Sequence, residues 1–414
     1  MNQSYPIRPI DPPEFVAFYE VGTQAFNSGW PPEVGRELEL LTFEFDRSAA
    51  AFDGDQIVGT ACAYTFQLSV PGAMAAAGGV SAVSVLPTRR RRGIMTGLIR
   101  HVLADIAERG EAIAILWASE PGIYGRFGFG CASELLRFNI RRGEDRLLPA
   151  AFPDKTAAPE VSIAEPGQQL AAMAAVYDSV AAGRPGLPSR DDRWWRAAIA
   201  DPEVTREGAS PLRCLIAADP GGPRGYATYS TRSKWADGIP GGEVRVHELQ
   251  ATDQQAAAAL WTDLLSRDLI AETHAWTRPV DDPLLVMLAD RRRSRAQLSD
   301  GLWVRLVDVP AALSQRRYAR DVDVVIEVTD PVMPANEGRY RLQARAGGPA
   351  TCEPASTAAD VTATVAALGA AYLGGMRLGA LAAAGQVAQE RPGAVAELSA
   401  AMSWDPAPWC PFVF

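Results

Sequence analysis

The sequence predicts a mixed α/β and α+β protein of three domains, and three observations predict it. Helix-type and strand-type segments alternate over residues 1–145, an order typical of a mixed sheet flanked by helices. Residues 146–307 repeat part of that order in weaker form. Residues 308–414 open with a helical segment, continue as alternating strands and then become rich in alanine. We therefore expect domain boundaries near residues 145 and 307.

Composition and charge fit a multidomain globular protein. The chain has 414 residues, 48% of them apolar and 21% charged, so it exceeds one typical domain and can bury several cores. The formal net charge of −9 argues against nucleic-acid binding, which needs a basic face, and suits a cationic partner. The N-terminus has no basic-then-apolar signal, and residues 361–385 are only mildly apolar. We therefore expect a cytoplasmic protein without a membrane span.

Cysteine and histidine are scarce. The five cysteines are odd in number and have no CxxC spacing: Cys62, Cys131, Cys214, Cys352 and Cys410. The three histidines form no metal-ligand spacing with them. We therefore predict neither a disulfide framework nor a metal site.

The first domain is expected to begin with two helices and a hairpin. In chain order its elements are helices over 13–25 and 31–42, strands over 49–52, 56–69 and 80–85, a helix after Gly93, a strand over 112–117, and a segment around Tyr124. Residues 53–55 (DGD) are the turn between the first two strands. This alternation predicts a mixed α/β sheet.

A basic glycine loop joins the strand at 80–85 to the helix that follows. Arg89 to Arg92 precede Gly93. The first turn of a helix has unpaired N–H groups and a partial positive charge, and glycine lets an anion approach the backbone, so the loop predicts a pyrophosphate site. It matches neither GxxxxGK(S/T) nor GxGxxG, which disfavours an NTPase or a dinucleotide-binding fold. A merely solvated basic loop is the alternative.

The second domain contains a weak copy of the first. Residues 225–231 (GYATYST) parallel residues 59–65 (GTACAYT), and a strand–helix junction follows each. The first junction has arginines and Gly93, whereas the second has Asp253, Gln254, Gln255 and Ala256. Because an acidic residue replaces the arginines and no glycine opens the second loop, we expect one active site per chain. Chance similarity of the two short segments is the alternative.

The sequence of the third domain predicts an α+β fold. A helical segment at 311–318 precedes alternating apolar residues at 322–328, which indicate a half-buried strand. A hairpin turn at 336–338 leads to a strand over 340–346, and alanine-rich helices follow. This order resembles the sterol-carrier-protein-like fold.

The basic loop resembles the acyl-CoA loop of the GNAT acetyltransferases, whose pattern is Q/R-x-x-G-x-G/A. Residues 90–95 (RRRGIM) match it, although Met95 departs from the usual Gly or Ala. Together with residues 118–130 (ASEPGIYGRFGFG) and the last residues, the three domains resemble the enhanced intracellular survival (Eis) family of N-acetyltransferases. That family has tandem GNAT domains followed by a sterol-carrier-like domain.

The resemblance implies an acetyl-CoA-dependent N-acetyltransferase and assigns its site residues. The acetyl-CoA contacts would be Val83, Ser84, Val85, Arg91, Arg92, Gly93, Ile94, Met95, Thr96, Ser119 and Glu120. Tyr124 would be the general acid, and the α-carboxylate of Phe414 would be the general base. The resemblance further implies a homohexamer and amine acceptors such as aminoglycosides and lysine side chains.

The chemistry of amine acetylation suits these assignments. A tyrosine with a pKa of about 10 is protonated at neutral pH and can donate to a thiolate leaving group, whereas a terminal carboxylate with a pKa of about 3.5 is ionised and can accept a proton. The Val85 N–H is a candidate oxyanion donor. The alternative for Tyr124 is an aromatic packed over a glycine turn. The apolar, proline-rich residues 404–414 indicate a buried terminus, and only the resemblance assigns Phe414 to the active site.

The acceptor side is predicted from residues 14–47. Seven carboxylates against two arginines are interleaved there with aromatic residues, a combination that suits a polycationic acceptor through charge attraction and cation–π contact. Trp30, Phe26 and Glu33 are the candidate acceptor-binding residues. An ordinary solvated helix face is the alternative.

Two other classes of function stay open. A lipid or sterol carrier built on the third domain would bind apolar ligands and be indifferent to changes at Arg91 or Tyr124. A non-catalytic CoA-sensing regulator would bind acetyl-CoA without turning over any acceptor.

Overall fold

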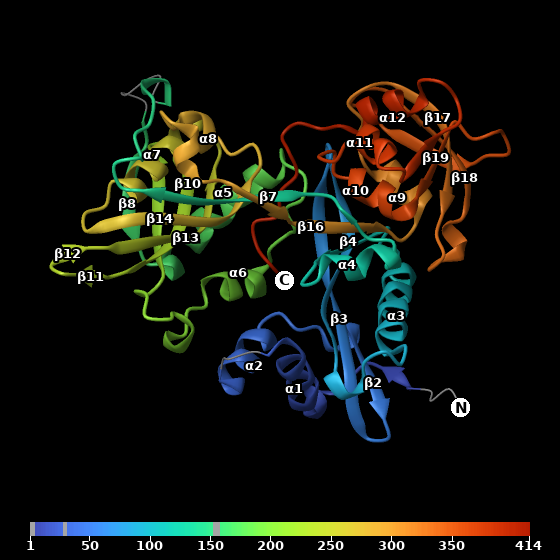
Figure 1. The fold of residues 1–414 in the computed structure, drawn as a ribbon, viewed down its shortest axis with the longest axis horizontal. Coiled ribbons are helices and arrows are strands. Elements are labelled where there is room, and N and C mark those ends of the chain that lie inside the picture. Colours follow the sequence, from blue (N-terminus) through green and yellow to red (C-terminus); the bar gives the residue numbers. More distant parts are fainter. Residues whose placement is uncertain (1–4, 28–30, 152–157) are drawn as a thin grey trace. The chain divides into compact units, whose positions relative to one another are not determined.

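The computed structural model describes residues 5–27, 31–151 and 158–414. It divides into two compact units, which we call the first and the second unit. The first contains Met1–Ser133, Gly301–Asp405 and Phe414, and the second contains Glu134–Asp300 and Pro406–Val413. Figure 1 labels most elements of both units. Within the described residues, no helix has the length and apolar character needed to cross a membrane.

A seven-stranded mixed sheet forms one core of the first unit. Its strands, in spatial order, are β1 (Ile7–Arg8), β2 (Ser48–Asp53), β3 (Gln56–Val70), β4 (Ala73–Val85), β5 (Ile113–Trp117), β16 (Leu302–Leu306) and β6 (Gly130–Cys131). β4 and β5 are parallel, and the other neighbours are antiparallel. A parallel pair needs a crossover, which helix α3 (Ile94–Glu108) supplies.

Helices pack on both faces of the β3–β4 hairpin. α3 lies on one side of the two strands, and α1 (Phe15–Phe26) lies on the other (Figure 1). A Cβ at Gly78 would come 2.5 Å from Ile106 Cδ1 of α3, so this glycine lets the helix approach. Because side chains alternate along a strand, Gly79 faces the side of α1 and α2 (Pro32–Leu40).

The second unit contains another seven-stranded sheet. Its strands, in spatial order, are β15 (Gln297–Asp300), β7 (Glu134–Arg141), β14 (Ile270–Pro279), β13 (Gly242–Ala251), β10 (Gly222–Arg232), β9 (Arg213–Asp219) and β8 (Glu160–Ala164). A short ribbon, β11 (Trp235–Ala236) with β12 (Ile239–Pro240), extends from it. Its helices are α5 (Leu170–Ala181), α6 (Asp192–Ile199), α7 (Gln254–Leu265) and α8 (Leu284–Met287). Leu260, Trp261 and Leu264 of α7 are fully buried in its core.

The two sheets share one topology. β9, β10 and β13 are antiparallel neighbours, and β13 pairs parallel with β14 after the crossover helix α7. β2, β3, β4 and β5 follow the same order around α3. Residues 59–65 lie in β3, which precedes the central strand β4, and residues 225–231 lie in β10, which precedes the central strand β13. The two similar segments therefore occupy equivalent positions.

A five-stranded sheet forms the rest of the first unit. Its strands, in spatial order, are β19 (Ala350–Pro354), β18 (Gly338–Ala344), β17 (Val322–Thr329), β20 (Val361–Thr364) and β21 (Val387–Gln389). Its helices are α9 (Val309–Gln315), α10 (Val365–Ala371), α11 (Leu378–Ala383) and α12 (Ala394–Met402). α10 packs directly on the first sheet, since a Cβ at Gly130 of β6 would come 2.0 Å from the Ala366 carbonyl oxygen.

The expected boundaries at residues 145 and 307 do not coincide with the sheet boundaries. β7 lies before residue 145 but pairs with β14 and β15 in the second sheet. β16 lies before residue 307 but inserts between β5 and β6 in the first sheet. Each sheet thus takes one strand from the segment assigned to the other, because strand pairing joins residues that are distant in the sequence.

Candidate active site

The central feature of the site is an opening between β4 and β5. Their parallel pairing covers Ala77 to Gly79 and stops there, although β4 continues to Val85. A β-bulge interrupts the β3–β4 register between the Thr60–Ser84 and Cys62–Ser81 pairs, with Ala82 at a φ of 50°. Bulges re-aim a strand next to functional sites. Here the bulged end of β4 diverges from β5 and leaves a cleft.

The alternation of hydrogen bonds directs one backbone donor into this cleft. The Leu86 N–H donates to the Val58 carbonyl on the β3 side. In an antiparallel ladder the next N–H points to the opposite edge of the strand. The Val85 N–H is therefore directed toward the side from which β5 has diverged, which suits the oxyanion role expected for it.

α3 begins beside the opening with an uncapped N-terminus. Its N-cap is Gly93, which has a φ of 81° and supplies no side-chain cap, and a Cβ there would meet open space. Arg91 also has a positive φ, 63°. The first N–H groups of a helix have no intrahelical partners and attract anions. The loop therefore presents its backbone donors to a ligand instead of satisfying them with a side chain.

A cavity of about 930 Å³ lies over these elements. Its walls contain most residues expected to contact acetyl-CoA: Val83, Ser84, Val85, Arg91, Gly93, Ile94, Met95, Thr96, Ser119 and Glu120. Four further arginines line it, Arg89, Arg90, Arg100 and Arg126. This basic wall fits a ligand with several phosphates. Arg92 is the exception, because it lies outside the cavity wall and donates a hydrogen bond to the Tyr5 hydroxyl (3.2 Å).

Tyr124 lines the same cavity at the end of α4 (Pro121–Tyr124). Its side chain is buried and packs edge-on against Phe129, with 6.2 Å between ring centroids. Burial raises the pKa of Tyr124, and a hydrogen bond with the Ser119 side chain opposes this rise. The hydroxyl is therefore protonated at neutral pH and available as a donor.

The chain terminus lies on β4, just before the bulge. The Ser81 hydroxyl donates to an α-carboxylate oxygen of Phe414 (3.0 Å), and the Phe414 ring packs edge-on against Phe66 (5.1 Å between centroids). Gly79 makes room for both rings, because a Cβ there would come 2.5 Å from Phe66 and 3.1 Å from Phe414. Phe414 does not line the 930 Å³ cavity. It contacts Ser81, which precedes Val83 by two positions on β4, and it lies on the face of β4 that α1 and α2 cover.

A half-buried carboxyl shares this sheet face. Tyr64, the cross-strand neighbour of Gly79, donates from its hydroxyl to Glu39 of α2 (3.2 Å). Burial raises the pKa of Glu39, and the Tyr64 hydrogen bond opposes the rise. The sequence pattern includes Glu39 in the acidic run but does not distinguish it, because its pairing with a strand residue is a tertiary contact.

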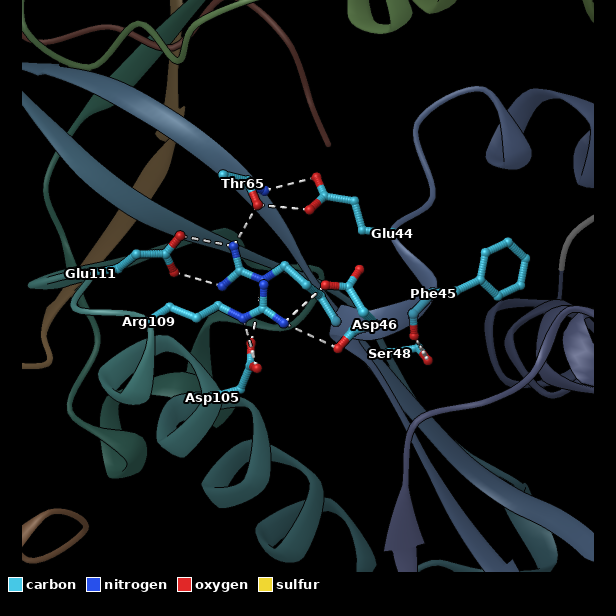
Figure 2. A network of polar contacts seen from close by, with 9 residues as sticks. Glu44, Phe45, Asp46, Ser48, Thr65, Asp105, Arg109 and Glu111 are labelled. Carbon is cyan, nitrogen blue, oxygen red and sulfur yellow. Dashed lines mark hydrogen bonds and ion pairs between the residues drawn. The ribbon is translucent and has the colours of Figure 1, made fainter.

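Other acidic residues of the same run stabilise the fold. Figure 2 shows Glu44 accepting from the backbone and hydroxyl of Thr65, and Asp46 paired with Arg109. Arg47, fully buried, pairs with Glu111 (2.6 Å) in the same network. These carboxylates therefore have structural partners, and the charge offered to an acceptor is smaller than the sequence count suggests.

The three candidate acceptor-binding residues have different outcomes. Phe26 lines the cavity and is about half exposed, at 52%. Glu33, in the first turn of α2, is exposed and does not line the cavity. Trp30 lies outside the described residues.

One group of side chains in the second unit has metal-ligand types close together. Glu243, Glu272 and His274 present ligand atoms within 4.8 Å of one another. Glu243 is paired with Lys234, and Glu272 is paired with Arg141. Because cationic side chains already neutralise both carboxylates, this group does not argue for a metal ion.

Family models assign the same architecture to the sequence. Residues 6–132 and 186–306 each match an acetyltransferase (GNAT) domain, and residues 309–411 match a sterol carrier protein domain. The first match contains the cavity loop and Tyr124, whereas the second contains the equivalent junction with Asp253.

Similar proteins align with most or nearly all of this chain. An uncharacterized N-acetyltransferase of Streptomyces coelicolor is 42% identical over 408 residues, which is 97% of each chain. The N-acetyltransferase Eis of Mycobacterium tuberculosis is 33% identical over 360 residues, covering 85% of this chain and 84% of its own. The crystal structure of Eis1 from Mycobacterium abscessus matches 99% of this chain and 100% of its own, with a TM-score of 0.83 and 31% identity.

The duplicated fold, the open α3 terminus and the sterol carrier domain define an acetyltransferase enzyme of the GNAT superfamily. GNAT acetyltransferases use acetyl-CoA as cosubstrate, and the basic cavity has the donors that this cosubstrate needs. Within the superfamily, the chain belongs to the Eis family of N-acetyltransferases.

Proposed function

We propose that the enzyme transfers the acetyl group of acetyl-CoA to amines of polycationic acceptors, aminoglycoside-type amines or lysine side chains. Tyr124 acts as general acid and the Phe414 α-carboxylate acts as general base. The observation that supports this division best is the arrangement along β4. The terminal residue hydrogen-bonds Ser81 before the bulge, and the cavity with Tyr124 begins at Val83.

Tyr124 serves the leaving thiolate. Its buried hydroxyl retains its proton at neutral pH, because burial raises the pKa. As the bond between sulfur and the acetyl carbon breaks, the sulfur gains negative charge and takes the hydroxyl proton. The Val85 N–H is directed into the opening of β4 and stabilises charge that develops on the carbonyl oxygen.

The terminal carboxylate serves the amine. A terminal carboxylate has an unperturbed pKa of about 3.5 and is ionised at pH 7. It accepts the amine proton, directly or through water, as the new bond forms. Because its proton affinity is low, it contributes mainly by orienting the neutral amine and by stabilising the ammonium charge. The Ser81 hydrogen bond and the Phe66 contact hold it at one place on β4.

The acceptor lies on the face of β3 and β4 that carries Phe414, Tyr64 and Glu39. A half-buried carboxyl beside aromatic rings attracts an ammonium group both by charge and by cation–π contact. Phe26 contributes an apolar wall, and Trp30 and Glu33 complete the acceptor side in this proposal. The net charge of −9 favours approach of a polycation. A homohexamer, by family resemblance, and a cytoplasmic location are part of the same proposal.

The experiment that tests the proposal is acetyl-CoA-dependent thiol release with kanamycin as acceptor. The native chain is compared with a chain extended by two alanines after Phe414, which moves the carboxylate away from Ser81. We expect turnover in the native chain and its loss in the extended one, with acetyl-CoA binding unchanged.

Val413→Ala is the matched control. Val413 is 65% exposed, so shortening it disturbs the same segment but leaves the terminal carboxylate in position. We expect native turnover in this variant. Full activity of the extended chain would assign the base to another group, and an inactive native chain would contradict the proposed acceptor class.

A further inference from the structure

The cofactor cavity has a wall that does not come from the GNAT fold. Pro331 and Val332 line it, and both belong to the segment that matches the sterol carrier domain. They follow directly after β17 and lie more than 200 positions beyond Tyr124 in the sequence. Their side chains are uncharged, so they suit the neutral parts of an acyl-CoA, whereas the arginines of the cavity suit its phosphates.

A buried carboxylate fixes the loop that carries these two residues. Asp330 is fully buried. Its Oδ1 accepts from the backbone N–H groups of Val332 (3.2 Å) and Met333 (3.1 Å), and its Oδ2 accepts from Asn336 Nδ2 (2.9 Å). One carboxylate therefore binds two backbone N–H groups of the loop and the Asn336 side chain.

Arg305 connects this loop to the turn that follows Tyr124. Its side chain, from β16, is fully buried and donates to Asp330 Oδ2 (2.6 Å). Another N–H of the guanidinium donates to the Phe127 carbonyl. Phe127 lines the cavity three positions after Tyr124. One arginine thus holds two walls of the cavity at a fixed separation.

Gly128 shows how closely the arginine approaches that turn. Its φ is 84°, and a Cβ there would come 1.6 Å from Arg305 Nη1. A side chain at this position would displace the guanidinium from the Phe127 carbonyl. Glycine is therefore needed at position 128 for two reasons: its positive φ, and the space occupied by an arginine that lies 177 positions later in the sequence.

We propose that residues 330–333 of the sterol carrier domain are part of the acyl-CoA site. Pro331 and Val332 contact the cosubstrate, and Arg305 and Asp330 are positioning residues that hold this contact surface against the Tyr124 turn. The sterol carrier domain then completes the cofactor cavity of the first GNAT domain. This inference rests on the proposed function, since it assumes that the cavity binds acetyl-CoA.

The first test places opposite charges at the proposed contact surface of the full-length protein. The dissociation constant of CoA is measured by calorimetry for Val332→Asp and Val332→Lys. Coulomb repulsion from the phosphates predicts that Val332→Asp weakens CoA binding by about tenfold, whereas Val332→Lys binds at least as tightly as the native chain. Both substitutions add a charge to the same half-buried position, so a general loss of stability would affect both alike.

Ala335→Asp is the matched control for this test. Ala335 belongs to the same loop but is exposed and does not line the cavity. We expect CoA affinity close to that of the native chain. Equal CoA affinities for Val332→Asp and Ala335→Asp overturn the inference and leave the proposed function intact. If the native chain itself binds no CoA, both the inference and the proposed function are wrong.

The second test addresses the positioning role. Removing one member of a buried ion pair leaves an uncompensated charge and can prevent folding, so Arg305→Met and Asp330→Leu are combined to remove both charges together. We expect the folded double variant to show a KM for acetyl-CoA raised by at least threefold, with the KM for the acceptor unchanged. A purely structural role would lower the active fraction, and hence kcat, at an unchanged KM. That result would overturn the positioning role.

Discussion

The crossover helices of the two GNAT domains occupy the same place in the same topology, yet they begin differently. α3 starts at Gly93, which supplies no side-chain cap. α7 starts at Asp253, whose carboxylate accepts from the N–H groups of Gln255 (2.9 Å) and Ala256 (3.0 Å). Arg224 pairs with the same carboxylate (2.8 Å). At the start of its crossover helix the second domain therefore has an ion pair between Asp253 and Arg224. The first domain has no side-chain cap at the same place, which leaves the helix N–H groups open to phosphates.

This difference teaches how a duplicated fold divides binding and stability. A capping carboxylate at a helix N-terminus contributes about 1 kcal/mol to stability. An uncapped N-terminus lacks that contribution but keeps its donors for a ligand. Gly93 leaves the N–H groups of its helix free to bind a ligand, whereas Asp253 stabilises its helix by capping them. Substitutions at equivalent places in the two domains should therefore change different quantities.

The largest expected effect is the loss of the Tyr124 hydroxyl. Tyr124→Phe keeps the ring packed on Phe129 but removes the proposed general acid, so we expect kcat to fall by about 100-fold with acetyl-CoA affinity unchanged. Steady-state kinetics and calorimetry separate the two. Because burial raises the pKa of this tyrosine, the native enzyme should retain its acid until the pH exceeds about 10.

Tyr177→Phe in the second unit is the control for this change. Tyr177 is fully buried, and its hydroxyl donates to the Pro188 carbonyl (2.7 Å). Its loss should cost about 1 kcal/mol in the free energy of unfolding and leave kcat unchanged. A similar fall in kcat for both variants would contradict the division of roles between the two domains.

Gly93→Val should have the next largest effect. A Cβ at φ of 81° is strained, and valine blocks the approach of a pyrophosphate to the backbone. We expect the KM for acetyl-CoA to rise by about tenfold or more, with a smaller change in kcat. Gly393→Val measures the strain alone, because Gly393 is the N-cap of α12 with a φ of 85° and lies at no cofactor site. An unchanged KM in Gly93→Val would remove this loop from the binding site.

Asp253→Ala should affect stability only. The variant removes the cap of α7 and the partner of Arg224, so we expect the free energy of unfolding to fall by about 1 kcal/mol in chemical denaturation. The kinetic parameters for acetyl-CoA should equal those of the native chain. Any change in the acetyl-CoA KM would show that the second domain retains a cofactor site.

Glu39→Gln has the smallest expected effect, and its sign depends on pH. Burial raises the pKa of Glu39, so ionising this carboxyl opposes folding. The native chain is therefore most stable at a pH below the ordinary pKa of a glutamate. It loses this part of its free energy of unfolding as the pH rises through the raised pKa. The glutamine variant cannot ionise. Relative to the native chain, its free energy of unfolding should therefore improve as the pH rises above about 4. Denaturation at several pH values measures this, and a constant difference would contradict it.

The local features of the site could be predicted from the sequence. The helices expected at 13–25 and 31–42 correspond to α1 and α2. The strand expected at 80–85 is the end of β4, and the helix expected after Gly93 is α3. These elements follow from hydrophobic periodicity and turn residues, which are local signals. The same local signals show that the equivalent loop of the second domain has Asp253 and no glycine.

The features that were not predicted depend on contacts distant in the sequence. The exchange of β7 and β16 between sheets is a matter of strand pairing, which periodicity does not specify. The Glu39–Tyr64 hydrogen bond and the wall formed by Val332 join segments that have no sequence pattern in common. Arg92 looks equivalent to its neighbours in the sequence, yet it turns toward Tyr5.

The insertion of β16 between β5 and β6 has a consequence for biosynthesis. The first sheet contains residues 302–306, so a ribosome must synthesise the chain as far as residue 306 before this sheet can close. Until then β5 has an unpaired edge, which nascent chains must protect from association. The first sheet is therefore incomplete in any nascent chain that ends before residue 302.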